Sequence, residues 1–158
     1  MVFRGAGHDF VPILTQQTDF LSKTSSLLVD MFETDDIDLR AGMEKEIKSC
    51  EAQGDALMTE FHEMLSVHPF VRLNKLDLQS VAMSMDDCLD AIKDTSKAVL
   101  IYRPAKLDDQ LKDLAQMAKS QSEVIHDVIP LLVDLKKNLP AISMACERVT
   151  ELEHAADD

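Results

Sequence analysis

The sequence IKSCEAQGD at residues 47–55 places two carboxylates, Glu51 and Asp55, beside the apolar positions Ile47 and Cys50. Side chains four residues apart lie on one face of an α-helix, about one turn from each other. Three segments of the chain therefore each carry an acidic pair beside an apolar stripe, because the same spacing recurs twice. The two further pairs are Asp86 with Asp90, and Glu153 with Asp157.

Apolar residues around the first pair recur in alternating steps of four and three, from Met43 to Leu65. That period is typical of helices in bundles or coiled coils. Gly54 lies in the stripe, although glycine inside a helix lowers its stability by ~1 kcal/mol relative to alanine. Another helix or a bound group is therefore expected to approach closely at this position. Similar periods elsewhere predict an all-α fold of long antiparallel helices at residues 10–32, 41–66, 76–102, 107–139 and 140–158, with a kink near Pro130.

The composition indicates a globular helical protein. The chain has 158 residues, of which 46% are hydrophobic, and only four are glycine. The net charge of −13 argues against nucleic acid and anionic lipid as partners, but it permits cations or a basic protein surface. No apolar run approaches the roughly 18 residues of a transmembrane helix, and no signal peptide begins the chain. A cytoplasmic protein without direct membrane insertion is predicted.

The three cysteines, Cys50, Cys88 and Cys146, lie within predicted helices and lack the CxxC spacing of many metal sites. They are predicted to be buried, reduced thiols that act as small hydrophobic residues.

An internal repeat is indicated by two short strings, LLVDM at residues 27–31 and LLVDL at residues 131–135. Glu51 follows the first string by 20 residues and Glu153 follows the second by 18. This order predicts duplication of a three-helix unit, although Leu-rich helices also share short strings by chance. The units are predicted at residues 1–103 and 104–158.

The second unit would then lack its third helix. An acidic run at a helix C-terminus opposes the helix dipole, so we expect the chain to be a piece that lacks about 50 further residues. The last two predicted helices would expose an apolar stripe. Dimerisation or domain swapping is expected to cover it, which predicts a homo-oligomer.

The first two acidic pairs are predicted to lie at the same height on neighbouring helices. Each pair lies 12 or 13 residues from the break between the second and third helices, about 18 to 20 Å along the helix axis. Four carboxylates at one height repel one another unless a cation joins them. The spacing alone leaves two interpretations open, a metal site of hard oxygen ligands or solvated helix faces.

Catalytic motifs are missing from the sequence. No Gly-x-Ser-x-Gly motif and no phosphate-binding glycine loop is present. A non-enzymatic protein is therefore predicted. Two alternatives remain: a di-metal carboxylate enzyme in a helical bundle, and a helical interaction module without metal.

The order of several motifs resembles the PhoU-like phosphate-transport regulators, and in particular the branch of accessory proteins of Pit-type inorganic phosphate permeases. The resemblance covers the chain from about residue 10 onward. It rests on IKSCEAQGD at residues 47–55, PFVR at 69–72, MDDCLDAI at 85–92, PLL at 130–132 and ELEHAAD at 151–157.

The resemblance implies two three-helix bundles in tandem, metal clusters of iron or zinc on the acidic motifs, and a regulatory, non-catalytic role in phosphate uptake at the permease. The family usually has an acid after the residues that correspond to 69–70, but this sequence has Val71 there. The second bundle is also incomplete. The first cluster would use Glu51, Asp55, Asp86 and Asp90, and Glu153 and Asp157 would form half of the second.

Overall fold

The computed structural model describes residues 10–68 and 73–157, and within these ranges all regular structure is helical, as predicted. The motif at residues 69–72 lies outside the described residues. The α-helices are α1 (Val11–Glu33), α2 (Ile37–Val67), α3 (Lys75–Tyr102), α4 (Asp109–Val128) and α5 (Leu135–Asp157), and the 3-10 helix η1 (Ile129–Asp134) joins the last two.

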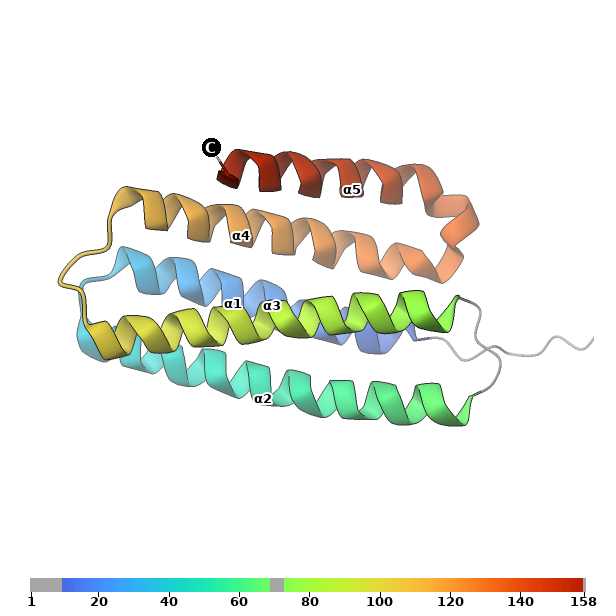
Figure 1. The fold of residues 1–158 in the computed structure, drawn as a ribbon, viewed down its shortest axis with the longest axis horizontal. Coiled ribbons are helices and arrows are strands. Elements are labelled where there is room, and N and C mark those ends of the chain that lie inside the picture. The colour runs from blue at the N-terminus through green and yellow to red at the C-terminus, as the bar shows by residue number, and fades with distance from the viewer. Residues whose placement is uncertain (1–9, 69–72, 158) are drawn as a thin grey trace, which may run out of the picture.

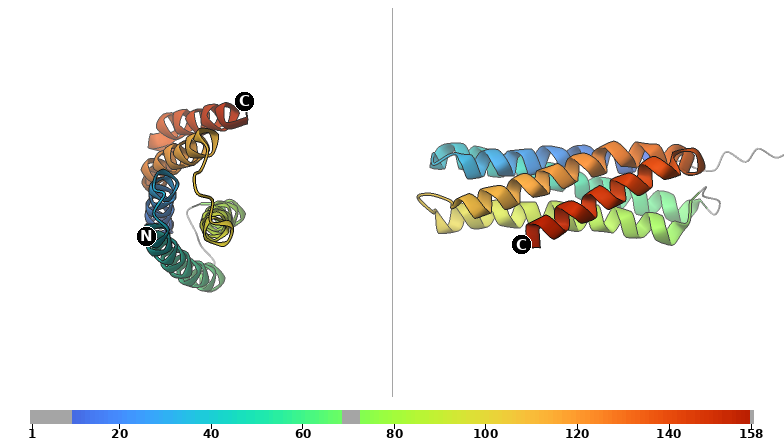
Figure 2. Two further views of the ribbon diagram at one scale, coloured as in Figure 1. Left: turned by 90° about the vertical axis from the view of Figure 1, so that its left-hand side faces the viewer. Right: turned by 90° about the horizontal axis from the view of Figure 1, so that it is seen from above.

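The helices form a curved row with one helix in its hollow. α5, α4, α1 and α2 follow one another along the row, and α3 packs on the concave side against α1 and α2 (Figure 1; Figure 2, left). α1 is central, because it contacts α2, α3, α4 and η1, whereas among the described helices α5 contacts α4 and η1 alone. The division at residue 103 into two repeated units stays a prediction.

Short polar side chains begin three of the helices. The Asp36 carboxylate accepts hydrogen bonds from the backbone N–H groups of Asp38 and Leu39, which begins α2 four residues earlier than the apolar pattern predicts. Asn74 caps α3 and Asp108 caps α4 in the same way. These side chains satisfy N–H groups that the first helical turn leaves free.

The prediction of one kinked helix over residues 107–139 is wrong. α4 ends at Val128, the chain reverses through η1, and α5 begins at Leu135. Pro130 lies in the first turn of η1, where its missing N–H and fixed φ end the α-helix instead of bending it. The apolar stripe predicted over residues 107–139 includes Leu135 and Leu139, which are 38% and 56% exposed.

Small polar residues allow α1 and α4 to approach closely. Ser25 of α1 and Ser122 of α4 are both buried, and their hydroxyl oxygens lie 2.7 Å apart in a hydrogen bond. At the end of α1, the buried Arg40 donates from Nε to the Met31 carbonyl and from Nη1 to the Pro104 carbonyl. Hydrogen bonds thus tie α1 to α2 and to α4, and tie Arg40 of α2 to the connection between α3 and α4.

The predicted burial of the cysteines is only partly right. Cys50 is buried, but Cys88 and Cys146 are exposed. Cys88 and Val81 are exposed on α3, whereas Ala82 and Leu89 of the same helix are buried in the core. Cys146 is exposed because, within the residues that the structure describes, α5 has α4 and η1 as its neighbouring elements.

No helix among the described residues combines the length and the apolar character needed to cross a membrane.

Candidate functional site

A polar layer separates two apolar clusters in the α1–α3 core. One cluster lies toward the α2–α3 connection and the other toward the opposite end of the bundle. Between them lie Gln17 on α1, Gly54 on α2 and Asp86 on α3. Members of the first cluster include Leu14, Met58 and Met85, and members of the second include Leu21, Ile47 and Leu89. The first two acidic pairs lie at the edge of this layer.

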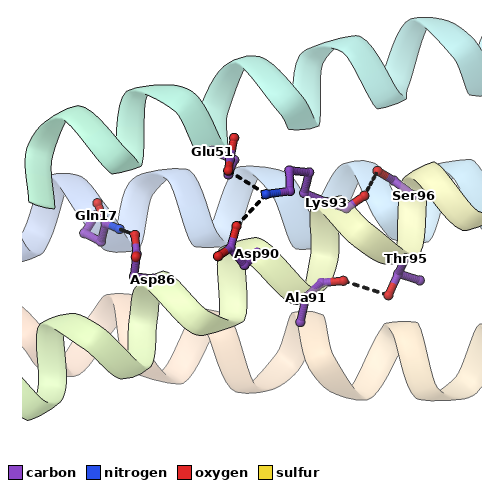
Figure 3. Close-up of polar contacts among 8 residues, drawn as sticks. All are labelled: Gln17, Glu51, Asp86, Asp90, Ala91, Lys93, Thr95 and Ser96. Atoms are coloured by element: carbon purple, nitrogen blue, oxygen red, sulfur yellow. Dashed lines mark hydrogen bonds and ion pairs between the residues drawn. The ribbon is translucent and has the colours of Figure 1, made fainter.

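Lys93 joins the acids of α2 and α3. Its Nζ lies 2.6 Å from Glu51 Oε1 and 2.6 Å from Asp90 Oδ1, so one ammonium bridges the two helices (Figure 3). The Glu51 side chain is 13% exposed and that of Lys93 is 26% exposed. Hydrogen bonds to Asp90 and then to Glu51 raise the pKa of Lys93, and the bond from Lys93 lowers the pKa of Asp90.

Asp86 is in a different environment from Asp90. It is half-buried and accepts a 3.4 Å hydrogen bond from Gln17 Nε2 (Figure 3). Burial raises the pKa of the Asp86 carboxyl, and the negative charges of Asp55 and Asp90 raise it further. The structure therefore brings the four carboxylates of α2 and α3 within electrostatic reach of one another, at the shared height expected from the spacing.

Gly54 allows α1 and α3 to approach α2. A Cβ atom at this position would lie 2.9 Å from Leu89 Cδ1 and 3.3 Å from Gln17 Nε2. The expected close approach at Gly54 is thus made by two neighbouring helices. Gln17 is 2% exposed, and among the described residues its Oε1 atom has no hydrogen-bond partner. A buried amide oxygen is costly to leave unpaired, so Gln17 marks a polar position without a complete set of partners.

The donor set fits a hard cation in its chemistry. Carboxylate and amide oxygens are the ligands that such ions prefer, and facing helices are a common support for them. With Lys93 between Glu51 and Asp90, however, the described ranges 10–68 and 73–157 hold no group of three or more Asp, Glu, His or Cys side chains arranged around one point. The roles of these acids as metal ligands stay predictions.

The third acidic pair lies apart from the first two. Glu153 and Asp157 are exposed on α5, which does not contact α2 or α3. Glu153 Oε2 lies 3.6 Å from Nε2 of its neighbour His154, an exposed contact. In the part of the chain that the structure describes, no second helix brings further acids to this pair.

Two site residues, Lys93 and Gln17, are missed by the acidic spacing. Lys93 follows Asp90 by three residues, which is the spacing of a helical ion pair and the signal that could have identified it. Gln17 lies between Leu14 and Leu21 on the apolar stripe of α1. A polar side chain at such a position indicates a polar layer, but which groups it meets depends on the neighbouring helices.

An apolar cleft lies on the opposite side of α3 from α2. It has a volume of about 470 Å³ and is lined by side chains of α1, α3, α4 and α5. Its lining includes Leu21, Val81, Met85, Ile125, Cys146 and Val149. The residues that line the cleft come from α3 on one side and from α1, α4, η1 and α5 on the other.

Comparison with known proteins shows a weak similarity to a Pit accessory protein. The chain is 26% identical over 81 residues to a Rhizobium meliloti (strain 1021) protein named "Putative pit accessory protein". The matched segment covers 51% of this chain and 38% of that protein. No protein-family model matches the chain. The similarity supports a relationship to Pit accessory proteins and leaves the PhoU-like tandem bundles as a prediction.

Proposed function

We propose that this chain is an accessory protein of inorganic phosphate transport, which regulates a Pit-type phosphate permease by contacting it from the cytoplasmic side. The similarity over 81 residues to the Rhizobium meliloti protein carries this proposal. The role is regulatory and non-catalytic. The order of sequence motifs that resembles the Pit-accessory branch supports the same assignment.

Charge supplies a means of contact with the permease. The chain carries 29 acidic and 16 basic residues, which gives a net charge of −13. Cytoplasmic loops of membrane proteins are enriched in lysine and arginine, and complementary charge speeds the encounter of two surfaces. The proposed complex should therefore weaken as salt concentration rises, because salt screens exposed charges.

The test of this role is phosphate uptake in cells that lack the gene. Deletion should change the rate or the phosphate dependence of uptake, and a plasmid copy should restore it. A deletion strain with the same uptake as its parent at both low and high phosphate would contradict the proposal.

The second part of the proposal concerns the carboxylates of α2 and α3, which we propose bind a metal ion such as iron or zinc. Glu51, Asp55, Asp86 and Asp90 would hold it, with the Gln17 amide oxygen as a neutral neighbour. A bound ion would neutralise the clustered charge and link α2 to α3. Elemental analysis of the isolated protein tests this. Asp55→Ala and Asp90→Ala should lose the metal, whereas Glu153→Ala should retain it.

A metal-free interaction module is the second candidate function. The bridge from Lys93 to Glu51 and Asp90 favours it, because one ammonium already joins the two helices without a metal. In that case a chelator would leave the thermal stability of the freshly isolated protein unchanged. A fall in the melting temperature after chelation would favour the metal site instead.

Self-association is a further part of the proposal. Met144 and Leu139 on α5 are 69% and 56% exposed, and the apolar cleft lies beside the same helix. We propose that a second copy covers this face, since exposed apolar surface of this kind commonly marks an interface. Light scattering after size exclusion measures the mass. A monomer at high concentration that Met144→Glu leaves unchanged would contradict self-association.

A further inference from the structure

We propose that the apolar cleft is the docking site for an amphipathic helix of the permease, one that carries lysine or arginine beside its apolar stripe. This inference rests on the proposed role in phosphate transport for the identity of the partner. It adds where on this chain the partner binds and which chemistry the partner presents. It does not depend on metal binding.

The walls of the cleft leave a place for one more helix. α3 forms one wall and α5 the other, and within the described residues these two helices do not contact each other (Figure 2, left). Small side chains on both walls let another helix come close, because the distance between packed helices depends on the side chains at the contact. They are Ser80, Ser84 and Cys88 on α3, and Ala145, Cys146 and Thr150 on α5. Longer apolar side chains, such as Leu21 and Ile125, complete the lining.

The apolar lining continues along α3 beyond the cleft. Val81 lines both the cleft and a second pocket of about 160 Å³, which reaches Leu78 and Leu132. The stretch of α3 from Asp77 to Cys88 that lines the two pockets is roughly 16 Å long, about three helical turns. Apolar grooves of this kind bind amphipathic helices through apolar residues spaced three and four apart.

The pattern that α5 shares with α2 indicates what such a helix should present. Val149 of α5 corresponds to Ile47 of α2, and four residues later Glu153 corresponds to Glu51. On α2 the partner is α3, which shares a buried cluster with Ile47 and whose Lys93 Nζ lies 2.6 Å from Glu51 Oε1. On α5, Val149 lines the cleft and Glu153 lies one turn further on the same face. A helix that packs on α5 in this way places a basic side chain against Glu153.

Charge decides between the permease and a second copy as the occupant. Asp77 lines the second pocket, and Glu153 and Asp157 follow the cleft lining on α5; all three are exposed acids. Arg148 pairs with Glu151 instead. Each of α1 to α5 carries more acidic than basic residues, so a helix of a second copy would add negative charge. Cytoplasmic segments of membrane proteins are rich in lysine and arginine, which gives the permease the complementary sign.

The proposed self-association can use another side of α5. Met144 is exposed and lies two residues from Cys146, and residues with this spacing do not share a helix face. A second copy on Met144 therefore leaves the cleft open to the permease helix.

The experiment uses the full chain and synthetic peptides that cover the cytoplasmic segments of the Pit-type permease of the same organism. Cys88 and Cys146 line the cleft and are exposed, whereas Cys50 is buried, so the first two thiols report on occupancy. Their alkylation by N-ethylmaleimide is followed by peptide mass spectrometry, with and without each peptide. Fluorescence anisotropy gives the affinity. A scrambled peptide of the same composition controls for charge without an apolar stripe.

Three variants test the two features of the cleft, its shape and its charge. Ser84→Trp fills the cleft from an exposed position, and Glu153→Lys reverses the charge beside it. Glu151→Lys makes the same change of charge two residues away, on a different face of α5. Circular dichroism checks that each variant is folded.

A basic amphipathic segment of the permease should protect Cys88 and Cys146 from alkylation, and its scrambled form should not. Ser84→Trp should weaken binding by about tenfold or more, since it blocks the centre of the contact. Glu153→Lys should weaken it by about fivefold, as expected for an ion pair replaced by like charges. Glu151→Lys should change the affinity by less than about twofold at physiological salt, because its charge is screened.

Failure of every permease peptide to protect the two cysteines would overturn the inference. So would binding that Ser84→Trp leaves unchanged, or equal losses in Glu153→Lys and Glu151→Lys, because the contact would then lie elsewhere. Protection that rises with protein concentration in the absence of peptide would assign the cleft to a second copy and also overturn it. The role in phosphate transport is judged separately: protection by a permease peptide, with unchanged phosphate uptake in the deletion strain, would contradict that role and leave the docking site standing.

Discussion

Two helices of this protein carry the same pattern and place it in different surroundings. On α2, Ile47 is fully buried and the acid Glu51 lies four residues later, bridged to α3 through Lys93. On α5, the corresponding Val149 is only half-buried and Glu153 is exposed. The difference lies in the neighbours, because α2 packs against two long helices and α5 against one.

The comparison shows that the acidic spacing supplies ligands but does not by itself form a site. An acid pair becomes part of a cluster only where a second helix brings further groups to the same height. At α2 that helix is α3, and a third helix contributes Gln17 from the buried side. At α5 the described chain provides no such partner. The following variants, made at corresponding positions, test this contrast.

The largest effect is expected from removing the apolar residue four positions before each acid. Ile47→Ala should lower the free energy of unfolding by about 3 to 4 kcal/mol, because it opens a cavity in a fully buried position. Val149→Ala should cost less than about 1 kcal/mol, since its site is already partly open to solvent. Urea denaturation measures both. Similar costs at the two positions would remove the contrast between α2 and α5.

A somewhat smaller effect is expected at Gly54 and its counterpart Ala156. Gly54→Val should destabilise the protein by about 2 kcal/mol, because even a Cβ atom there would contact Leu89 Cδ1 at 2.9 Å. Ala156→Val should change stability by less than about 0.5 kcal/mol near the end of α5. Denaturant midpoints compare the two. A tolerated valine at residue 54 would mean that α1 and α3 approach α2 less closely than described.

The ion pairs of α2 and α5 should also differ in how much they stabilise the protein. In the presence of a chelator, Lys93→Met should cost about 1 kcal/mol, since it leaves the half-buried Glu51 without its partner. The pair between Arg148 and Glu151 on α5 is exposed at both ends, and Arg148→Met should cost less than about 0.5 kcal/mol. Thermal unfolding compares them. Equal losses would show that the bridge of Lys93 is an ordinary surface pair.

The smallest effect concerns the contact between α1 and α4 at His126. Hydrogen bonds to Asp127 and then to Asp19 of α1 raise the pKa of His126. A raised pKa in the folded state stabilises the protein below the ordinary value of 6.5, and this contribution is lost as pH rises through the folded pKa. The side chain is 40% exposed, so the screened effect should be below about 0.5 kcal/mol.

His126→Gln should reduce this part of the pH dependence when unfolding is measured from pH 5 to pH 8. Gln116→Ala, at an exposed position on the same helix, serves as a control that keeps His126. If His126→Gln and the control show the same pH dependence as wild type, the contact with Asp19 does not contribute in solution.

Helical periodicity was enough to predict the fold class and the meeting of two acidic pairs. Alternating apolar steps locate α1, α2 and α3 closely, and equal distances from the α2–α3 break place Glu51 and Asp90 at one height. The predicted end of the fourth helix was wrong because the apolar period continues through Pro130. Periodicity does not show which proline ends a helix. The exposure of Cys146 was missed because it depends on how many helices surround α5.

The roles of Lys93 and Gln17 required the packed structure. Lys93 could face water or either neighbouring helix from its place in the sequence, and only the crossing of α2 and α3 decides between them. Gln17 interrupts an apolar stripe, but its link to Asp86 spans 69 residues of chain. Contacts of this kind are set by tertiary packing, which local patterns do not encode.

We propose that the acids of α2 and α3 form one cation site, whereas those of α5 have no second acidic helix beside them within the described residues. A crystal structure of the Mn²⁺-soaked protein, with anomalous scattering from manganese, tests this most directly. The proposal predicts an anomalous peak between α2 and α3, beside the carboxylates of Glu51, Asp55, Asp86 and Asp90. A peak only at Glu153 and Asp157, or no peak with Lys93 still bridging the two helices at high Mn²⁺, would contradict it.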